Sequence, residues 1–206
     1  KLAGTALDRV LLSTEVAGKT AHAAGSLVFM QDGIGGPAVL NLSRFLTEPV
    51  PGKDCPRHIK IDLVPDCDAA CLENDLIASY KAHPKRPVFK LVALWVPKRL
   101  AEQLCHLVGC TPDLWAGNLT KVKRRELVKC LKSLVLTVIG TRRLAEATVT
   151  RGGIATDEID DQTMASKKCP ALYFAGEIID VDGLCGGYNL QICWSTGALA
   201  GRAAAT

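Results

Sequence analysis

The spacing of apolar residues changes twice along this 206-residue chain, and this change limits the possible folds more than any other feature. Residues 1–65 hold β-rich runs, and residues 58–64 alternate apolar and polar side chains with the period of a strand. Residues 66–133 instead repeat apolar side chains at helical spacing, and strand-like runs return at Leu134. The sequence therefore predicts an α+β fold.

Proline, aspartate and glycine mark the expected ends of the helices. Pro37 is expected to open one helix, and Asp68 to cap a second that runs to about His83. Pro97 is expected to open a third helix, which Gly109 stops. The later part of the chain predicts strands over 134–139, 147–150 and 172–175, of which the last is buried, and a helix over 189–205.

Composition and cysteine content exclude several classes of protein. No apolar run approaches the ~18 residues of a membrane helix, and the first residues lack the apolar core of a signal peptide. Nine cysteines cannot all pair within the chain, and no C-x-x-C motif occurs, so neither a disulfide framework nor a metal site is expected. Most cysteines stand among apolar neighbours and are expected to be buried thiols, typical of a reducing cytoplasm.

Basic residues cluster once in the sequence, over 121–132. The formal net charge of the whole chain is only +4, which does not indicate a nucleic-acid partner. A surface helix with a solvated basic face is the favoured interpretation, because apolar residues recur at helical spacing within the cluster. The alternative is a non-catalytic module that binds an acidic protein or nucleic acid through this face. The basic residues are Lys121, Lys123, Arg124, Arg125, Lys129 and Lys132.

A glycine-rich motif at residues 33–38 matches the G-x-G-x-x-A pattern of dinucleotide-binding loops. Pro37 removes an amide that a phosphate would contact, and Asp62 lies farther from Gly33 than the about 20 residues usual for the ribose-binding acid. A structural turn is therefore the favoured interpretation. A true dinucleotide loop is the second enzyme interpretation.

A second motif, at residues 172–191, carries more chemistry. An acidic side chain can accept hydrogen bonds from hydroxyl groups, and the open amides of a helix N-terminus attract negative charge. The segment therefore predicts a site for a polyol that carries an electron-rich ring. A tight turn built by the same aspartates and glycines is the alternative. The features in chain order are the expected strand ending at Gly176, the acid Glu177, a loop with Asp180, and Gly186 and Gly187 before a helix.

The motif at 172–191 resembles the carboxy-terminal signature of the HI0933-like flavoproteins, a bacterial family that includes BaiN-type NAD(P)/FAD-dependent oxidoreductases. Residues 148–154 and 163–167 resemble the family's V-T-x-G-G-V and T-M-x-S-K motifs, and residues 25–38 resemble its G-x-L-L-F…G-P-A motif. Met30, Gln31 and Gly35 differ, since they stand where the family usually has Thr, His and Ser.

The resemblance implies a domain order and a set of cofactor-binding residues. Residues 1–65 and 134–155 would form a β-barrel-like domain, and 66–133 a helical subdomain inserted in it. Residues 156–206 would be the returning C-terminal strand and helix of a Rossmann-like FAD-binding domain. Gly176 and Glu177 would face the ribityl-phosphate region of FAD. The four residues 187–190 would lie against its isoalloxazine ring. The implied residues are Gly176, Glu177, Asp180, Gly186, Gly187, Tyr188, Asn189 and Leu190.

The resemblance also implies an activity. The parent would pass a hydride from NAD(P)H through FAD to an unsaturated or carbonyl small molecule, with neither nucleic acid nor membrane as partner. The family's N-terminal G-x-G-x-x-G unit is expected to be missing, so this chain would be a fragment whose partner is that FAD-binding part. Alone it is expected to bind FAD weakly or not at all. No side chain is predicted to be catalytic, and the localisation is expected to be cytoplasmic.

Overall fold

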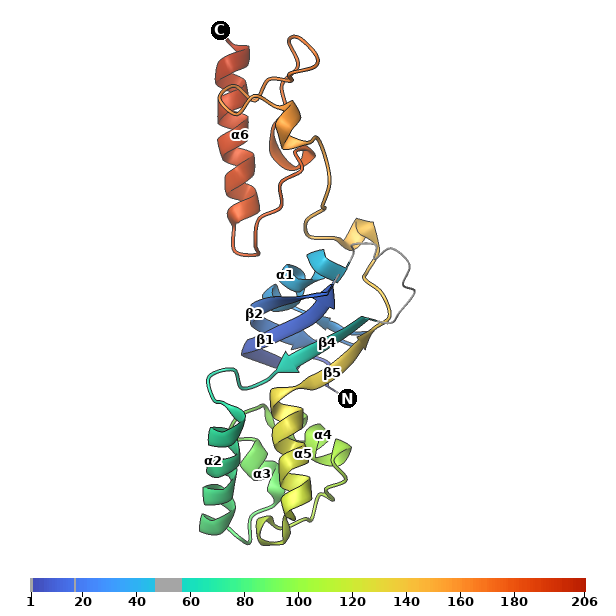
Figure 1. The fold of residues 1–206 in the computed structure, drawn as a ribbon, viewed down its shortest axis with the longest axis vertical. Coiled ribbons are helices and arrows are strands. Elements are labelled where there is room, and N and C mark those ends of the chain that lie inside the picture. Colours follow the sequence, from blue (N-terminus) through green and yellow to red (C-terminus); the bar gives the residue numbers. More distant parts are fainter. Residues whose placement is uncertain (1, 17, 47–56) are drawn as a thin grey trace. The chain divides into compact units, whose positions relative to one another are not determined.

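The computed structural model describes residues 2–16, 18–46 and 57–206. The chain divides into two compact units, Lys1–Ile139 and Gly140–Thr206 (Figure 1). The strands of the first unit are β1 (Ala6–Val16), β2 (Lys19–Phe29), β3 (Ile34–Gly35), β4 (Arg57–Asp62) and β5 (Leu134–Val138). Its helices are α1 (Pro37–Leu46), α2 (Ala69–Ala82), α3 (Val88–Val92), α4 (Lys98–Leu107), the 3-10 turn η1 (Ala116–Asn118) and α5 (Lys121–Lys132). The second unit holds the 3-10 turns η2 (Leu144–Glu146), η3 (Thr156–Glu158) and η4 (Gly176–Ile178), and helix α6 (Tyr188–Ala204).

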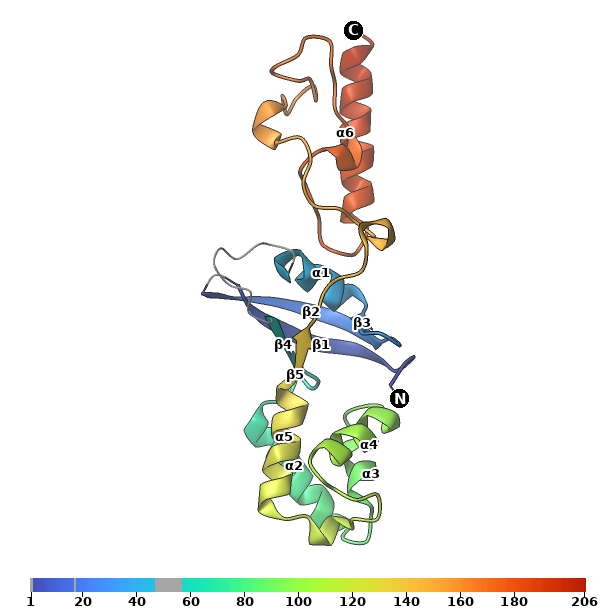
Figure 2. The ribbon, with the colours of Figure 1, turned by 90° about the vertical axis from the view of Figure 1, so that its right-hand side faces the viewer.

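The strands of the first unit form one antiparallel sheet in the order β3-β2-β1-β4-β5. Figures 1 and 2 show the sheet curled like half a barrel, with α1 lying across one face. The predicted alternation is confirmed, because Ile59 and Ile61 of β4 are buried while Lys60 between them is exposed. The mixture of helices and strands and the barrel-like sheet confirm the predicted α+β class for this unit.

The glycine-rich motif before α1 is a packing device, and the dinucleotide-loop interpretation is wrong. The strands before and after α1 both join antiparallel ladders, β3 with β2 and β4 with β1, so no parallel strand–helix–strand unit exists here. Gly36 has φ +99°, and a Cβ at that position would lie 2.8 Å from the carbonyl oxygen of Ser26. The glycine thus lets the chain pass close to β2 as it enters α1.

The four helices α2 to α5 fall between two adjacent strands of the sheet. Ile61 of β4 pairs with Leu134 of β5, so the chain leaves the sheet and returns to it at one place. Asp68 caps α2 as predicted, because its carboxylate accepts a hydrogen bond of 2.7 Å from the amide of Cys71. Leucines from α2, α3, α4 and α5 share one buried cluster with the sheet.

An ion pair joins the two ends of this helical segment where it leaves and re-enters the sheet. We call this place, between Asp62 and Lys132, the neck. The Nζ of Lys132, at the end of α5, lies 2.7 Å from the Oδ2 of Asp62 at the end of β4. The same ammonium donates to the carbonyl of Val64 at 2.8 Å and to that of Cys67. Both charged side chains are about four-fifths buried, with exposures of 18% and 19%. Asp62, the acid required by the dinucleotide interpretation, is therefore occupied by a structural contact.

The second unit differs more from its predicted elements. The strand predicted at 147–150 is wrong, because this segment is largely exposed and forms no strand or bridge with any residue that the structure describes. The strand predicted at 172–175 is reduced to a single antiparallel bridge between Tyr173 and Ala165, and it is not buried. The C-terminal helix is confirmed as α6. The two units meet at residues 139 and 140, while the domain boundaries implied by the resemblance stay a prediction.

In the described part of the chain, no helix combines the length and the apolar composition needed to cross a bilayer.

Replacing Lys132 with methionine tests the ion pair at the neck. The change keeps the aliphatic stem but leaves the Asp62 carboxylate and two carbonyls without their donor, so the free energy of unfolding should fall by about 1–3 kcal/mol. Chemical denaturation followed by circular dichroism measures this value. The control is Lys129→Met on the same helix, which should change stability by less than about 0.5 kcal/mol because Lys129 is exposed. Equal losses in both variants would contradict the account.

Candidate functional site

All eight residues implied by the resemblance lie in the second unit, in three neighbouring pieces of chain. Gly176 and Glu177 form part of η4, and Asp180 is the second residue after η4 ends. Gly186 and Gly187 make the turn that leads into α6. Tyr188, Asn189 and Leu190 form the first turn of that helix.

Gly176 attaches η4 to the middle of α6. Its amide donates a hydrogen bond of 3.0 Å to the hydroxyl of Thr196, which itself donates to the carbonyl of Ile192 at 2.7 Å. The backbone of Gly176 has φ +76°, a conformation that favours glycine. Glu177, the next residue, is exposed, and its carboxylate has no ion pair or hydrogen bond within the described chain. The docked glycine thus presents the acid to solvent at a defined place.

Asp180 is held by the glycine-rich segment that precedes η3. Its Oδ1 accepts a hydrogen bond of 3.1 Å from the amide of Gly152, while Ile154 and Ile179 form a parallel bridge beside it. A Cβ on Gly153 would lie 2.3 Å from the carbonyl oxygen of Ile178, so only glycine allows the two segments to approach this closely. Asp180 therefore has a structural contact as well as its predicted cofactor role. Gly153, whose importance depends on the close approach to Ile178, was not among the predicted site residues.

Asn189 closes the loop in front of α6. Its Oδ1 accepts a hydrogen bond of 2.7 Å from the amide of Gly183, and its Nδ2 donates to the carbonyl of the same residue at 3.1 Å. A Cβ on Gly183 would lie 2.9 Å from the Cβ of Tyr188, so this glycine is required by the close approach. The side-chain amide of Asn189 is thus engaged in fixing the loop, while its backbone amide lies in the first turn of α6.

The start of α6 has open amides. The cap residue Gly187 has φ +92° and no side chain that could accept hydrogen bonds from the first turn. Its carbonyl accepts the amide of Gln191 at 3.1 Å, which begins the regular helical pattern. The amides of Tyr188, Asn189 and Leu190 therefore point outward at the positive end of the dipole of a 17-residue helix. This end can hold a group that carries negative charge or electron density.

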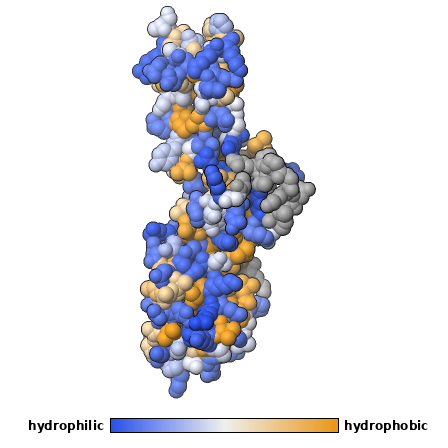
Figure 3. Space-filling model, in the orientation of Figure 1, coloured by the Kyte–Doolittle hydropathy of each residue, from blue (hydrophilic) through white to orange (hydrophobic). Residues whose placement is uncertain are grey.

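One side of α6 is apolar and uncovered within the second unit. Leu190 and Trp194 lie on this side and are 60% and 67% exposed, whereas Tyr188, 62% exposed, lies off it at the start of the helix. Figure 3 shows hydrophobic side chains on the visible face over the first half of this helix. Gly197 and Gly201 follow on the same side as Trp194, and no other segment comes within 4 Å of a Cβ built there. We call this side, from Leu190 to Gly201, the open face of α6. The buried core of the described unit is small, comprising Ile159, Met164, Ile179 and Ala200.

The basic cluster lies on α5 as predicted, but several of its charges serve the fold. Arg124 is buried and contacts Glu73 at 3.1 Å, and Arg125 contacts the same carboxylate at 3.8 Å. Lys123 donates to the carbonyl of Gly109 at 2.6 Å, in addition to the contacts of Lys132 at the neck. The predicted solvated basic face is therefore wrong for Arg124 and Lys132, whose side chains are largely buried, whereas Arg125 remains 64% exposed.

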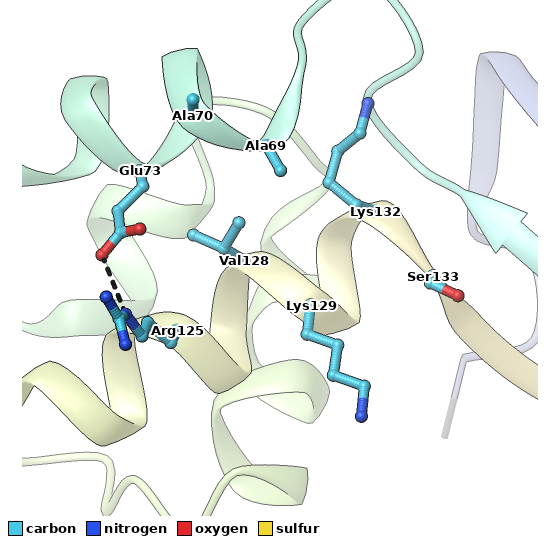
Figure 4. A pocket seen from close by; sticks show the side chains of 8 residues that line it. All are labelled: Ala69, Ala70, Glu73, Arg125, Val128, Lys129, Lys132 and Ser133. Carbon is cyan, nitrogen blue, oxygen red and sulfur yellow. Dashed lines mark ion pairs between the residues drawn. The ribbon is translucent and has the colours of Figure 1, made fainter.

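A shallow groove of 590 Å³ lies between α2 and α5. Ala69, Ala70 and Val128 give it an apolar floor, and Lys129 and Ser133 lie on its α5 side. Figure 4 shows Glu73 and Arg125 facing each other across one end of the groove. Lys121 and Lys129 are exposed, and neither has an ion pair or hydrogen bond within the described residues.

The cysteines differ from their predicted burial. Among the described cysteines, only Cys105 and Cys110 are buried, and desolvation raises the pKa of the Cys105 thiol to about 12. Cys71, in the first turn of α2, is exposed instead. A hydrogen bond with Cys67 and the nearby carboxylate of Asp75 raise the pKa of the Cys71 thiol to about 11. The expectation of mostly buried thiols is therefore wrong. No disulfide joins the described cysteines.

Three known proteins share much of this sequence. Residues 1–149 match the family described as HI0933-like protein barrel and H2TH domain. The chain is 37% identical over 171 residues to the ribosomal RNA dihydrouridine synthase of Escherichia coli (strain K12), a match covering 83% of this chain and 40% of that protein. It is 31% identical over 186 residues to the 3-dehydro-bile acid delta(4,6)-reductase of Clostridium scindens, covering 90% of this chain and 45% of that protein. The ribosomal RNA dihydrouridine synthase of Haemophilus influenzae is 33% identical over 195 residues, with coverages of 93% and 45%. The chain thus spans less than half the length of these curated relatives.

Replacing Gly153 with alanine tests the approach that holds Asp180. The new Cβ would meet the Ile178 carbonyl, and the backbone has φ +154°, so the substitution should destabilise the second unit by about 1–3 kcal/mol. Amide hydrogen exchange should show faster exchange at Ile154 and Asp180, whose amides bond across this contact. Gly201→Ala is the control. It lies in a helix with open space around it and should be neutral or stabilising by about 0.5–1 kcal/mol. Unchanged exchange in Gly153→Ala would refute the assignment.

Proposed function

The chain belongs to the HI0933-like family, and we propose that it supplies the barrel-like, helical and C-terminal flavin-contacting parts of an FAD-dependent oxidoreductase. The observation that carries this proposal is the start of α6. Its open amides, its glycine cap and its exposed apolar side chains lie together in one turn. The family match over residues 1–149 covers the motif at 25–38, which carries part of the resemblance.

The residues at this turn fit a flavin. The amides of Tyr188, Asn189 and Leu190 would donate to the electron-rich edge of the ring, and the apolar side chain of Leu190 would cover part of it. Glu177 would accept hydrogen bonds from the ribityl hydroxyls, since its carboxylate is exposed and held next to the docked Gly176. Asp180 and Gly186 would shape the loop between these two groups. When bound, the flavin supplies hydride transfer between a nicotinamide and the substrate.

The open face of α6 supports a partner that completes the FAD-binding domain. Small residues at 197, 198 and 201 leave room for close packing, and Trp194 is too exposed for a helix that stays uncovered. We propose that the remainder of a Rossmann-like FAD-binding domain, contributed by a longer parent protein, covers this face. The chain alone would then bind FAD weakly or not at all, and it would act as the segment that orients the ring.

The names of the relatives indicate one class of chemistry. Dihydrouridine is uridine whose ring double bond has been reduced, and a delta(4,6)-reductase also acts on carbon–carbon double bonds. We therefore propose that the parent reduces a carbon–carbon double bond conjugated to a carbonyl group, with NAD(P)H as the electron donor. A small-molecule substrate in the cytoplasm is the first proposal.

RNA is the second candidate substrate, and the surface of α5 favours it. Lys121 and Lys129 are exposed and unengaged within the described chain, and Arg125 is only partly neutralised at 3.8 Å from Glu73. These side chains could contact phosphates without breaking any contact that holds the fold. An acidic protein could use the same charges.

Flavin occupancy tests the first proposal. In the longer protein that contains this chain, Glu177→Ala should weaken FAD binding by about tenfold or more, because a charge-assisted hydrogen bond is lost. The ratio of flavin absorbance to protein after dialysis measures the effect. Glu102→Ala, which removes an exposed glutamate from α4, should leave this ratio unchanged. Full occupancy in Glu177→Ala would remove the ribityl assignment. Micromolar FAD binding by the 206-residue chain alone would contradict the need for a partner.

Salt-dependent binding tests the RNA candidate. If RNA is the substrate, the double variant Lys121→Ala/Lys129→Ala should bind a uridine-rich RNA more weakly and reduce the slope of log affinity against log salt by about 1–2. The matched double variant Lys81→Ala/Lys85→Ala removes two other exposed lysines and should have little effect. The absence of RNA binding by the unchanged chain at low salt would dismiss the candidate.

A further inference from the structure

Two thiols and a carboxylate meet where the chain enters the helical segment. The Sγ atoms of Cys67 and Cys71 and a carboxylate oxygen of Asp75 all lie within 4.8 Å of one another. Cys67 precedes the cap of α2, Cys71 lies in the first turn and Asp75 in the second, so one short segment supplies all three groups. It is the one such group of three found among the residues that the structure describes.

We propose that Cys67, Cys71 and Asp75 form a binding site for a thiophilic divalent cation of the Zn²⁺ class. The cysteine spacings alone predict no metal site, because paired short spacings are absent. The carboxylate, which lies four residues beyond Cys71, completes a set that the cysteine spacing alone does not indicate.

The distances are close to those that a bound cation requires. Zinc binds thiolate sulfur at about 2.3 Å and carboxylate oxygen at about 2.0 Å, so a tetrahedral ion would separate sulfur from oxygen by roughly 3.5 Å. The Sγ of Cys71 already lies 3.8 Å from the Oδ2 of Asp75. Small rotations of exposed side chains would therefore bring the ligands to an ion. The protons of the two thiols would pass to the solvent as the metal binds.

The surroundings favour these three ligands and leave a fourth position open. Asp68, another acid beside Cys71, is engaged in capping α2, where its carboxylate accepts a hydrogen bond from the Cys71 amide. The positive charge of Lys132 nearby is paired with Asp62, which limits its repulsion of a cation. Cys71 and Asp75 are exposed, so water can complete the coordination. Three protein ligands and one water form an exchangeable site rather than a closed structural one.

Such an ion would connect the segment before α2 to the helix itself. Cys67 packs against the core and its carbonyl accepts a hydrogen bond from Lys132, so its position is already fixed by the neck. Binding would therefore add a second tie at the same entrance. It should raise the stability of the first turns of α2 in proportion to the free metal concentration.

Cadmium titration tests the proposal directly. The 206-residue chain, kept reduced with a phosphine, should bind one Cd²⁺ at this site, seen as cadmium–thiolate ultraviolet absorption. Cys71→Ser should lose that absorption, and Asp75→Asn should weaken the binding at least severalfold. The controls are Cys169→Ser and Asp113→Asn, which replace another exposed thiol and carboxylate and should keep the full signal. Cys71 and Asp75 are exposed, so circular dichroism should confirm that these variants fold.

Protection from alkylation gives an independent readout on the unchanged sequence. Zn²⁺ should slow the modification of Cys67 and Cys71 by iodoacetamide, measured by peptide mass spectrometry, while modification of Cys169 should continue at the same rate. Equal cadmium absorption in Cys71→Ser and the unchanged chain, or no protection of Cys71 by Zn²⁺, would overturn the proposal. A Cys67–Cys71 disulfide that persists under reduction would overturn it as well.

Discussion

The ion pair between Asp62 and Lys132 is the contact on which the first unit depends. An antiparallel sheet can accept a long insertion between two neighbouring strands only if the chain leaves and returns at one point. Here β4 ends at Asp62 and α5 ends at Lys132, and the ammonium also satisfies two carbonyls of the segment that leads to α2. Because both side chains are largely buried, the attraction between them is screened less than in a surface pair. The helical segment is thereby held to the sheet at a defined place.

The second unit depends on close backbone approaches instead of a large core. Gly153 lets the segment before η3 pair with Ile179, Gly183 lets the loop close on Asn189, and Gly176 attaches η4 to Thr196. These contacts hold Glu177 and the first turn of α6 as parts of one framework. The four buried residues of this unit add little burial by themselves. The open face of α6 is apolar and is not buried by this small core, and a partner that covers it would account for its exposure.

The sequence was most informative where local chemistry decides the structure. The cap at Asp68, the helix start at Pro37 and the alternation of β4 were predictable, since each depends on neighbouring residues. Helix α3 was missed, because five residues after Pro87 give too short a pattern for recognition. The role of Lys132 was also missed, for a different reason. In the sequence it is one of several basic residues of a solvated face, and only the pairing of β4 with β5 places it beside Asp62.

For the candidate site, motif resemblance located the segment but not the function of each residue within it. Asp180 and Asn189 both have contacts within the protein that no spacing rule indicates. Their partners are backbone groups of Gly152 and Gly183, and no side-chain pattern in the sequence marks these groups. The central claim is that the amides at the start of α6 hold a flavin. Hydrogen–deuterium exchange of the proposed longer parent, compared with and without FAD, tests it most directly. The account predicts that FAD slows exchange at the amides of Tyr188, Asn189 and Leu190, whereas unchanged exchange at these amides would contradict it.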